Sequence, residues 1–309
     1  MEQFDFQGSN QKKHYFEGWY YKNVQEDMFY SLAIIPGICL NTTDSHAFIQ
    51  LNDSTKSYYF RYPLDQFSLS DHGIWIGTNY FSKEQLYLDI DKDVSIHGKL
   101  EFHELTELKK TLFRPTIMGP FSYFKMQCNH GIISLKHSIS GTLMMDGKEV
   151  CFDKGLGYIE KDYGTSFPKD YIWCSSNCSV NHDSAFFFST AHIPFFHTSF
   201  KGLISILYVD GKEYSFCTYD GAKIKELYVK DGMLKLKLKK KKLILDVQCY
   251  YDQDHLLLAP SKGQMVIPIK ESLDATMKVK LYEKQKLIYS DLFLAGGLEI
   301  KKESKDSKK

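Results

Sequence analysis

Hydrophobic and polar residues alternate one by one along much of this chain, which is the pattern of β-strands with one buried face. The apolar positions of 86–90 share one face. Three leucines within 234–238 lie opposite three lysines of the run 235–242. We expect this lysine run to be the solvent face and protected edge of a strand, rather than a nucleic-acid or membrane surface.

Turn signals separate the alternating segments. Asp-Gly pairs favour the positive φ angles of tight hairpin turns, and they occur at 146–147, 210–211, 220–221 and 231–232. His-Gly pairs at 72–73, 97–98 and 130–131 add further signals. Long segments with a helical period are nearly absent, and only 82–86 and 270–277 fit short helices. The pattern predicts an all-β sandwich or barrel.

The chain of 309 residues is long enough for one large β domain or two medium ones. An aromatic segment at 15–22 has a faint echo at 157–177, and strands and turns follow each of them. This echo predicts two similar units, an N-terminal one over 1–152 and a C-terminal one over 153–300. The charged end 301–309 lacks apolar anchors, and we expect it to be disordered.

Composition excludes several classes of partner. The net charge is +1, so nucleic acid has no general electrostatic attraction to the chain. No apolar run reaches the roughly 20 residues that span a bilayer, which leaves at most transient membrane contact. The N-terminus lacks the pattern of a signal peptide, so we expect a cytoplasmic protein. The sequence leaves the oligomeric state open.

Seven cysteines, an odd number without a Cys-x-x-Cys pair, indicate reduced thiols. Cys174 and Cys178 are spaced like metal ligands, but no second pair accompanies them. We therefore expect no bound metal.

Five segments resemble one known family in the same order along the chain. They are Phe16-Glu-Gly-Trp-Tyr-Tyr-Lys22, Met118-Gly-Pro-Phe-Ser122, His130-Gly-Ile-Ile-Ser-Leu-Lys-His-Ser-Ile-Ser-Gly141, Gly157-Tyr-Ile-Glu-Lys-Asp-Tyr-Gly164 continued by Phe167-Pro168, Trp173 and Asn177, and Ala295-Gly-Gly-Leu-Glu-Ile300. Together they resemble the tocopherol cyclase family. The resemblance implies two lipocalin-like β-barrel or sandwich units, related to the carotenoid hydratase-like fold.

The resemblance also implies an activity that needs no cofactor. A proton is added to a prenyl double bond, and a phenol oxygen closes the ring, so the substrate is a hydrophobic prenylated phenol or quinol. The alternatives are a non-catalytic, lipocalin-like binder or carrier of an apolar metabolite, and a barrel whose ancestral site has decayed. A long apolar cavity in the barrel would hold the prenyl tail.

The carboxylates of the fourth segment are the candidate acid. If 157–163 is a strand, Tyr158, Glu160 and Asp162 share one face. Burial would favour protonation of one of two neighbouring carboxyls, which provides an acid and a base together. We therefore expect Glu160 or Asp162 to donate the proton. The alternative is a solvated face on which Lys161 pairs with a neighbour.

Two histidines are candidate partners. His137 shares a face with apolar residues of 132–140. It is either a core histidine satisfied by one hydrogen bond or a catalytic base that orients a carboxylate. His130 precedes a glycine and is the weaker candidate.

Trp19 shares its face with Glu17, and such a tryptophan commonly closes one end of a lipocalin-like barrel. Glu17 beside it is a candidate buried partner for a lysine or an arginine such as Arg114. Trp173 could support a cation, and Asn177 could hold a phenol oxygen. The residues that we expect to contact substrate are Trp19, Tyr20, His130, Tyr158, Trp173 and Asn177.

Overall fold

The structure is a computed structural model that describes residues 3–8, 13–53, 55–195, 198–252 and 255–302. It divides into two compact units, which are residues 1–167 with 257–268 and residues 168–256 with 269–309. The expected tail lies almost entirely outside the described residues, so its disorder stays a prediction.

The boundary expected at 152 is wrong by one strand. Strand β12 (Gly155–Gly164) was assigned to the second unit, but it hydrogen-bonds to β1 (Tyr15–Val24) on one side and to β10 (Cys128–Met145) on the other. Both partners belong to the first unit, so the chain enters the second unit only after Phe167.

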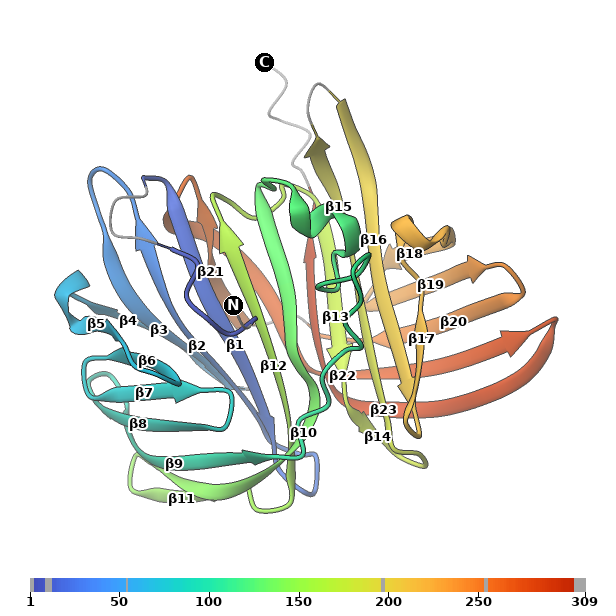
Figure 1. Ribbon diagram of the computed structural model, residues 1–309. Helices are drawn as coiled ribbons and strands as arrows, with labels where there is room; N and C mark the ends of the chain where they lie inside the picture. Colours follow the sequence, from blue (N-terminus) through green and yellow to red (C-terminus); the bar gives the residue numbers. More distant parts are fainter. Residues whose placement is uncertain (1–2, 9–12, 54, 196–197, 253–254, 303–309) are drawn as a thin grey trace. The chain divides into compact units, whose positions relative to one another are not determined.

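The first unit contains a sheet of twelve antiparallel strands among the described residues (Figure 1). Its neighbours run in the order β4 (Ser57–Tyr62), β3 (His46–Asp53), β2 (Ser31–Leu40), β1, β12, β10, β9 (Ser95–His103), β8 (Gln85–Asp91), β7 (Asn79–Ser82), β6 (Gly73–Ile76) and β5 (Phe67–Leu69), with β11 (Lys148–Cys151) paired to β10.

The second sheet has eleven strands in the described part of the chain. Its order is β17 (Lys212–Ser215), β16 (Thr198–Val209), β15 (Ser184–Phe195), β13 (Tyr171–Ser176), β23 (Lys286–Lys301), β22 (Gln264–Glu283), β20 (Leu243–Tyr250), β19 (Met233–Lys240) and β18 (Lys223–Lys230). Two strands lie off this path: β14 (Cys178–Ser179) pairs with β23, and β21 (His255–Ser261) pairs with β22.

The all-β class is confirmed, since the described residues contain strands and three single 3-10 turns, η1 (Leu64–Gln66), η2 (Gly119–Tyr123) and η3 (Thr218–Asp220). The two short helices expected from the sequence are wrong, because 270–277 lies inside β22 and 82–86 meets β7 and β8. In β22 the buried side chains recur at every second position from 277 to 281, which is the period of a strand and not of a helix. No helix in the described part is long and apolar enough to cross a membrane.

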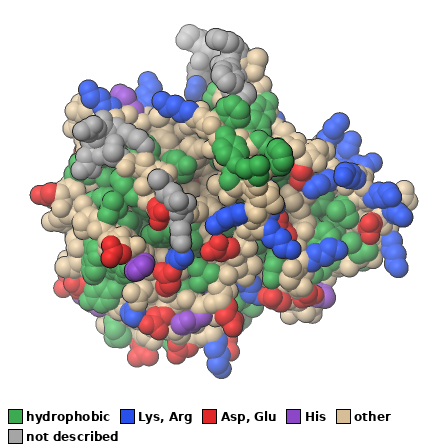
Figure 2. Space-filling view, in the orientation of Figure 1, with side chains coloured by type: hydrophobic (Ala, Val, Ile, Leu, Met, Phe, Trp, Pro, Cys, Tyr) green, Lys and Arg blue, Asp and Glu red, His purple; other side chains and the backbone are tan. Residues whose placement is uncertain are grey.

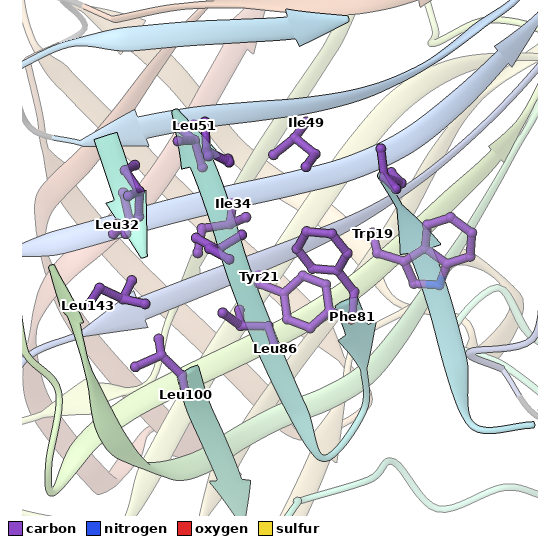
Figure 3. Packing of buried hydrophobic residues seen from close by; sticks show 14 of the residues in the cluster. Trp19, Tyr21, Leu32, Ile34, Ile49, Leu51, Phe81, Leu86, Leu100 and Leu143 are labelled. Atoms are coloured by element: carbon purple, nitrogen blue, oxygen red, sulfur yellow. The ribbon is translucent and has the colours of Figure 1, made fainter. Parts of the chain in front are cut away.

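Each unit has its own apolar core. In the first, aromatic and aliphatic side chains from both halves of the sheet fill the interior, with Trp19, Tyr21 and Phe81 fully buried (Figure 3). Trp19 is part of this core, and its indole Nε1 donates to the Phe4 carbonyl at 3.0 Å. Its expected place at the closed end of a barrel stays a prediction. In the second, Phe186 and the leucines of β19 are buried.

Three of the four Asp-Gly pairs form hairpin turns with both residues at positive φ, at 146–147, 210–211 and 231–232. The fourth, Asp220-Gly221, ends η3 instead. His97-Gly98 and His130-Gly131 lie inside β9 and β10, so those turn predictions are wrong.

The lysine run is partly as expected. The leucines of β19 are buried, and Lys235 faces out to an ion pair with Glu226 at 2.8 Å. However, β19 lies between β18 and β20, so the expected sheet edge is wrong.

Candidate active site

Strand β12 carries ionisable side chains on both of its faces. Tyr158, Glu160 and Asp162 share one face, as the spacing predicts, because Ile159 and Lys161 point to the core of the first unit. Glu160 is only 6% exposed. The solvated face that the sequence left open as an alternative is therefore absent at this position.

His130 joins these carboxylates from the neighbouring strand. It lies directly opposite Asp162 in the register of β10 and β12. Its Nδ1 is 2.9 Å from Asp162 Oδ1, and its Nε2 is 3.6 Å from Glu160 Oε2. The Tyr158 hydroxyl donates to Glu160 Oε2 at 2.5 Å. We name Tyr158, Glu160, Asp162 and His130 the acid cluster.

The electrostatics of the acid cluster favour a charged imidazole. Burial alone would lower the pKa of His130, but the carboxylates of Asp162 and Glu160 outweigh it and raise this pKa to about 9. His130 is therefore an imidazolium at neutral pH. The Cys128 thiol lies 3.7 Å from Asp162 Oδ1, and burial raises its pKa well above the usual range, so it stays protonated.

A pocket of about 150 Å³ opens beside His130. Its wall mixes apolar groups with hydrogen-bonding ones, and it includes Met118, Asn129, Tyr163 and Lys161. Of the acid cluster, His130 is the member that lines it. The backbone N–H of His130 donates to Met118 Sδ at 3.1 Å, which ties η2 to the site. An apolar cavity of this volume is large enough to hold a benzene ring. The pocket therefore matches the size of one aromatic head group.

Tyr20 lies on the same side of the sheet as the acid cluster. Its ring meets that of Tyr158 edge-on, with 6.4 Å between the ring centroids. Trp19, its neighbour in β1, points the opposite way into the core. Of these two predicted substrate contacts, the structure brings only Tyr20 to the cluster.

His137 is separated from the carboxylates. Its Nε2 occupies the space that a Cβ on Gly157 would need, on the core face of β12, and its ring centroid is 4.7 Å from that of Phe102. Nδ1 is 3.0 Å from the Ser134 hydroxyl. Burial, with a smaller effect of His103, lowers the pKa of His137 to about 3, so it is neutral. This is the core histidine that the sequence analysis gave as the alternative.

A second buried ion pair lies on the core face of β12. Lys161 Nζ is 2.9 Å from Glu17 Oε1 and donates to the Asp5 carbonyl at 2.5 Å. Glu17 also accepts from the backbone N–H groups of Gln7 and Gly8 and from the Tyr15 hydroxyl. We name Glu17, Lys161 and these partners the core clamp.

Glu17 has a buried lysine partner, as one of the two expected residue types, but Arg114 is not its partner. Arg114 donates instead to the Lys109 carbonyl, and Lys161 takes the place suggested for it. The sequence missed this pairing because it depends on the register of β1 and β12, in which Lys161 lies opposite Trp19. The only available signal was that a lysine shared the core-facing positions with Ile159.

His130, Glu160 and Asp162 are also close enough together to ligate a metal ion, with one ligand atom from each within 4.8 Å of the others. A histidine nitrogen with carboxylate oxygens suits zinc or iron. The 2.9 Å contact between His130 and Asp162 is, however, that of a direct hydrogen bond. The geometry therefore already accounts for the cluster as an ion pair.

Trp173 and Asn177 belong to the second unit, in β13 and directly after it, and both are buried. In that unit the Tyr171 hydroxyl donates to Glu299 at 2.6 Å. The expected substrate contacts of Trp173 and Asn177 stay predictions.

Solved structures resemble this chain in fold. CghA gives a TM-score of 0.62 at 11% identity, covering 94% of this chain and 89% of CghA. CghA with Sch210972 gives 0.60 at 12% identity, covering 93% and 88%. A Nitrosomonas europaea protein described as an AttH gives 0.55 at 10% identity, covering 94% of both chains. These likenesses show the lipocalin-like, carotenoid hydratase-like fold, as expected.

None of the curated protein sequences matches the chain. Residues 110–301, more than half of the 309, match the family described as tocopherol cyclase-like. That match covers η2 and the acid cluster, and it supports an enzyme of the cyclase type. The chain belongs to the tocopherol cyclase-like family.

Proposed function

We propose that this protein is an acid-initiated cyclase of a hydrophobic, prenylated phenol or quinol. A carboxyl of the acid cluster gives its proton to one alkene carbon, and a tertiary cation forms at the other. The phenol oxygen attacks this cation, and its proton returns to the cluster as the C–O bond closes. The product is an isomer of the substrate, so the reaction needs no redox partner or other cofactor.

The observation that carries the proposal is two carboxyls and one imidazolium buried together, with His130 among the residues that line a pocket of the size of an aromatic ring. Net charge is costly to bury. In the proposal one carboxyl of the cluster holds a proton, and this proton is the one given to the alkene.

The members of the acid cluster differ in their contacts. Asp162 Oδ1 is 2.9 Å from Nδ1 of the His130 imidazolium. Glu160 lies farther from the ring, at 3.6 Å, and accepts the Tyr158 hydroxyl. A hydrogen bond to the carboxylate stabilises what remains after proton transfer. We therefore assign proton donation to Glu160, and to Asp162 the task of keeping His130 charged.

His130 lines the pocket, and the proposal seats the phenol head group there. Asn129 in the same wall can hydrogen-bond a second oxygen of a quinol. Buried apolar side chains pack together in the core of the first unit (Figure 3). The long apolar cavity expected for the prenyl tail stays a prediction.

The test is turnover of prenylated hydroquinones in D₂O, followed by mass spectrometry. The proposal expects a chromanol of unchanged composition that carries one carbon-bound deuterium. Glu160→Gln and Asp162→Asn should each reduce the rate by about 10²–10⁴-fold. Glu149→Gln, an exposed carboxyl on β11 of the same unit, is the matched control. Normal turnover in both cluster variants would show that the acid is wrongly assigned.

Two other outcomes would redirect the proposal. A product heavier by one water would keep the proton donor but make water the nucleophile, which is a hydratase. A ligand that is retained in native mass spectrometry without any conversion would support the binder or carrier instead.

A further inference from the structure

The two units differ in charge. The second contains 22 lysines and arginines against 17 aspartates and glutamates, whereas the first contains 17 against 21. The near-neutral net charge of the chain therefore hides a basic second unit. Figure 2 shows Lys and Arg side chains gathered on the right of the view, over the part that carries β18 to β20 in Figure 1.

Six exposed lysines meet at one end of the second sheet. Three elements reach this end: the start of β18, the β19–β20 turn and the β22–β23 turn. Their neighbourhood follows from the pairing of Lys223 with Lys239, of Leu243 with Glu283, and from a backbone hydrogen bond of 2.9 Å between Lys284 and Lys242. We name as the lysine end Lys223, Lys239, Lys241, Lys242, Lys284 and Lys286.

The lysine end is unfavourable for the isolated protein in two ways. Lys223 and Lys239 are direct cross-strand partners, and like charges in that position repel. Lys241 and Lys284 adopt positive φ angles of 52° and 49°, where a side chain strains the backbone. Other hairpins of this chain use Asp-Gly in such turns. Lysines thus occupy two turn positions, 241 and 284, at which glycine or asparagine would fit the backbone better.

The partner of this charge is not within the described residues, because none of the six lysines makes an ion pair there. Next to them, two aliphatic side chains face out from the start of β23: Leu287 is 47% exposed and Ile288 is 42% exposed. Lysines around a small apolar tip match an anionic bilayer surface, where each lysine contributes about 1 kcal/mol and the aliphatic groups enter the interface.

We propose that the lysine end, with Leu287 and Ile288, docks the protein on a membrane surface that carries anionic lipid headgroups. Glu283, the acidic side chain in the β22–β23 hairpin, limits the attraction without cancelling it. The contact is peripheral and reversible. It does not depend on the proposed reaction, although a prenylated substrate would itself dissolve in the bilayer.

Flotation of the full chain with vesicles tests this contact. We expect binding to phosphatidylcholine vesicles that contain about 30% phosphatidylserine, little binding to phosphatidylcholine alone, and release by salt. Lys241→Asn, Lys242→Gln and Lys284→Asn together should weaken the partition by about 100-fold. Asparagine tolerates positive φ, so this triple variant should fold at least as well as the parent.

The matched control is Lys201→Gln, Lys230→Gln and Lys278→Gln, which removes three exposed lysines of the second unit outside the lysine end. It should keep most of the binding. Equal loss in both triple variants would reduce the effect to net charge and overturn the proposal. A lack of binding to anionic vesicles at low salt would also overturn the proposal. Binding of a short RNA as tightly as the anionic vesicles would overturn it as well, because it would show a general affinity for polyanions.

Discussion

The two faces of β12 carry buried charges in very different settings. On the core face, Lys161 is matched by Glu17 and by backbone carbonyls at fixed positions. On the other face, two carboxyls lie around one imidazolium. The core clamp pairs one ammonium with one carboxylate. The acid cluster brings two carboxyls and an imidazole together, which are groups able to give and take protons near neutral pH.

This difference separates a structural ion pair from a reactive one within a single strand of ten residues. Burial alone does not distinguish them, since Lys161 is more deeply buried than Glu160. What distinguishes them is their chemistry: the core clamp is a single ammonium–carboxylate pair, whereas the acid cluster combines two carboxyls with an imidazole. Stability should therefore depend mainly on the core clamp, and activity on the acid cluster.

The largest expected effect is on the core clamp. Lys161→Met should lower the free energy of unfolding by about 3–5 kcal/mol, because Glu17 is left with an unbalanced buried charge. Equilibrium urea unfolding measures the change. Adding Glu17→Gln to this variant keeps an acceptor for Tyr15 and for the backbone N–H groups, and it should restore more than half of the loss. A loss below about 1 kcal/mol in the single variant would contradict the clamp.

His137 should make the protein sensitive to acid. The pKa of His137 is about 3 in the folded chain, against an ordinary value of 6.5 that applies to the unfolded chain. Between pH 3 and pH 6.5 the unfolded chain therefore binds a proton that the folded chain does not. Stability from this group is complete above pH 6.5 and falls by on the order of 1 kcal/mol per pH unit toward pH 3. Urea titrations at several pH values should show a shallower acid limb in His137→Asn. An unchanged limb would mean that His137 is not held neutral.

His130 should act in the opposite direction. Its pKa is raised to about 9 from 6.5, so its contribution is complete below pH 6.5 and disappears as the pH rises through 9. The shift corresponds to about 3 kcal/mol. Urea unfolding at pH 6 to 10 measures this loss of stability at alkaline pH. Both His130→Gln and Asp162→Asn should remove it, while His72→Gln, at an exposed site of the same unit, should retain it. If Asp162→Asn kept the full slope, the ion pair would not be its cause.

The sequence predicted the shared face of Tyr158, Glu160 and Asp162, because alternation along one strand needs only local information. It favoured His137 as the partner of these carboxyls, whereas His130 lies beside them, because the choice depends on which residue of β10 faces which residue of β12. The pairing of these strands shifts between Ile132 and Ser134 and again between Ser134 and His137. Such bulges move side chains from one face to the other and leave no reliable signal in the pattern.

The same limit explains the other errors. Asp-Gly fixed three hairpin turns, since the positive φ angles are a property of two residues. The position of β12 between β1 and β10 joins segments more than a hundred residues apart, and the expected boundary near 152 failed for that reason. Aromatic and aliphatic alternation was sufficient for the fold class, whereas Lys161 and His130 required the register.

The smallest expected effect sharpens the comparison most. Glu160→Gln should change the free energy of unfolding by less than about 1 kcal/mol, even though Glu160 is nearly as buried as Glu17. Glutamine still accepts the Tyr158 hydroxyl, and Asp162 remains as the closer carboxyl partner of His130. Thermal and urea unfolding beside the turnover assay would show loss of activity with retained stability. A loss of stability as large as that of Lys161→Met would instead show that the buried charges on both faces of β12 serve the fold. The assignment of the acid cluster as the catalytic site would then be contradicted.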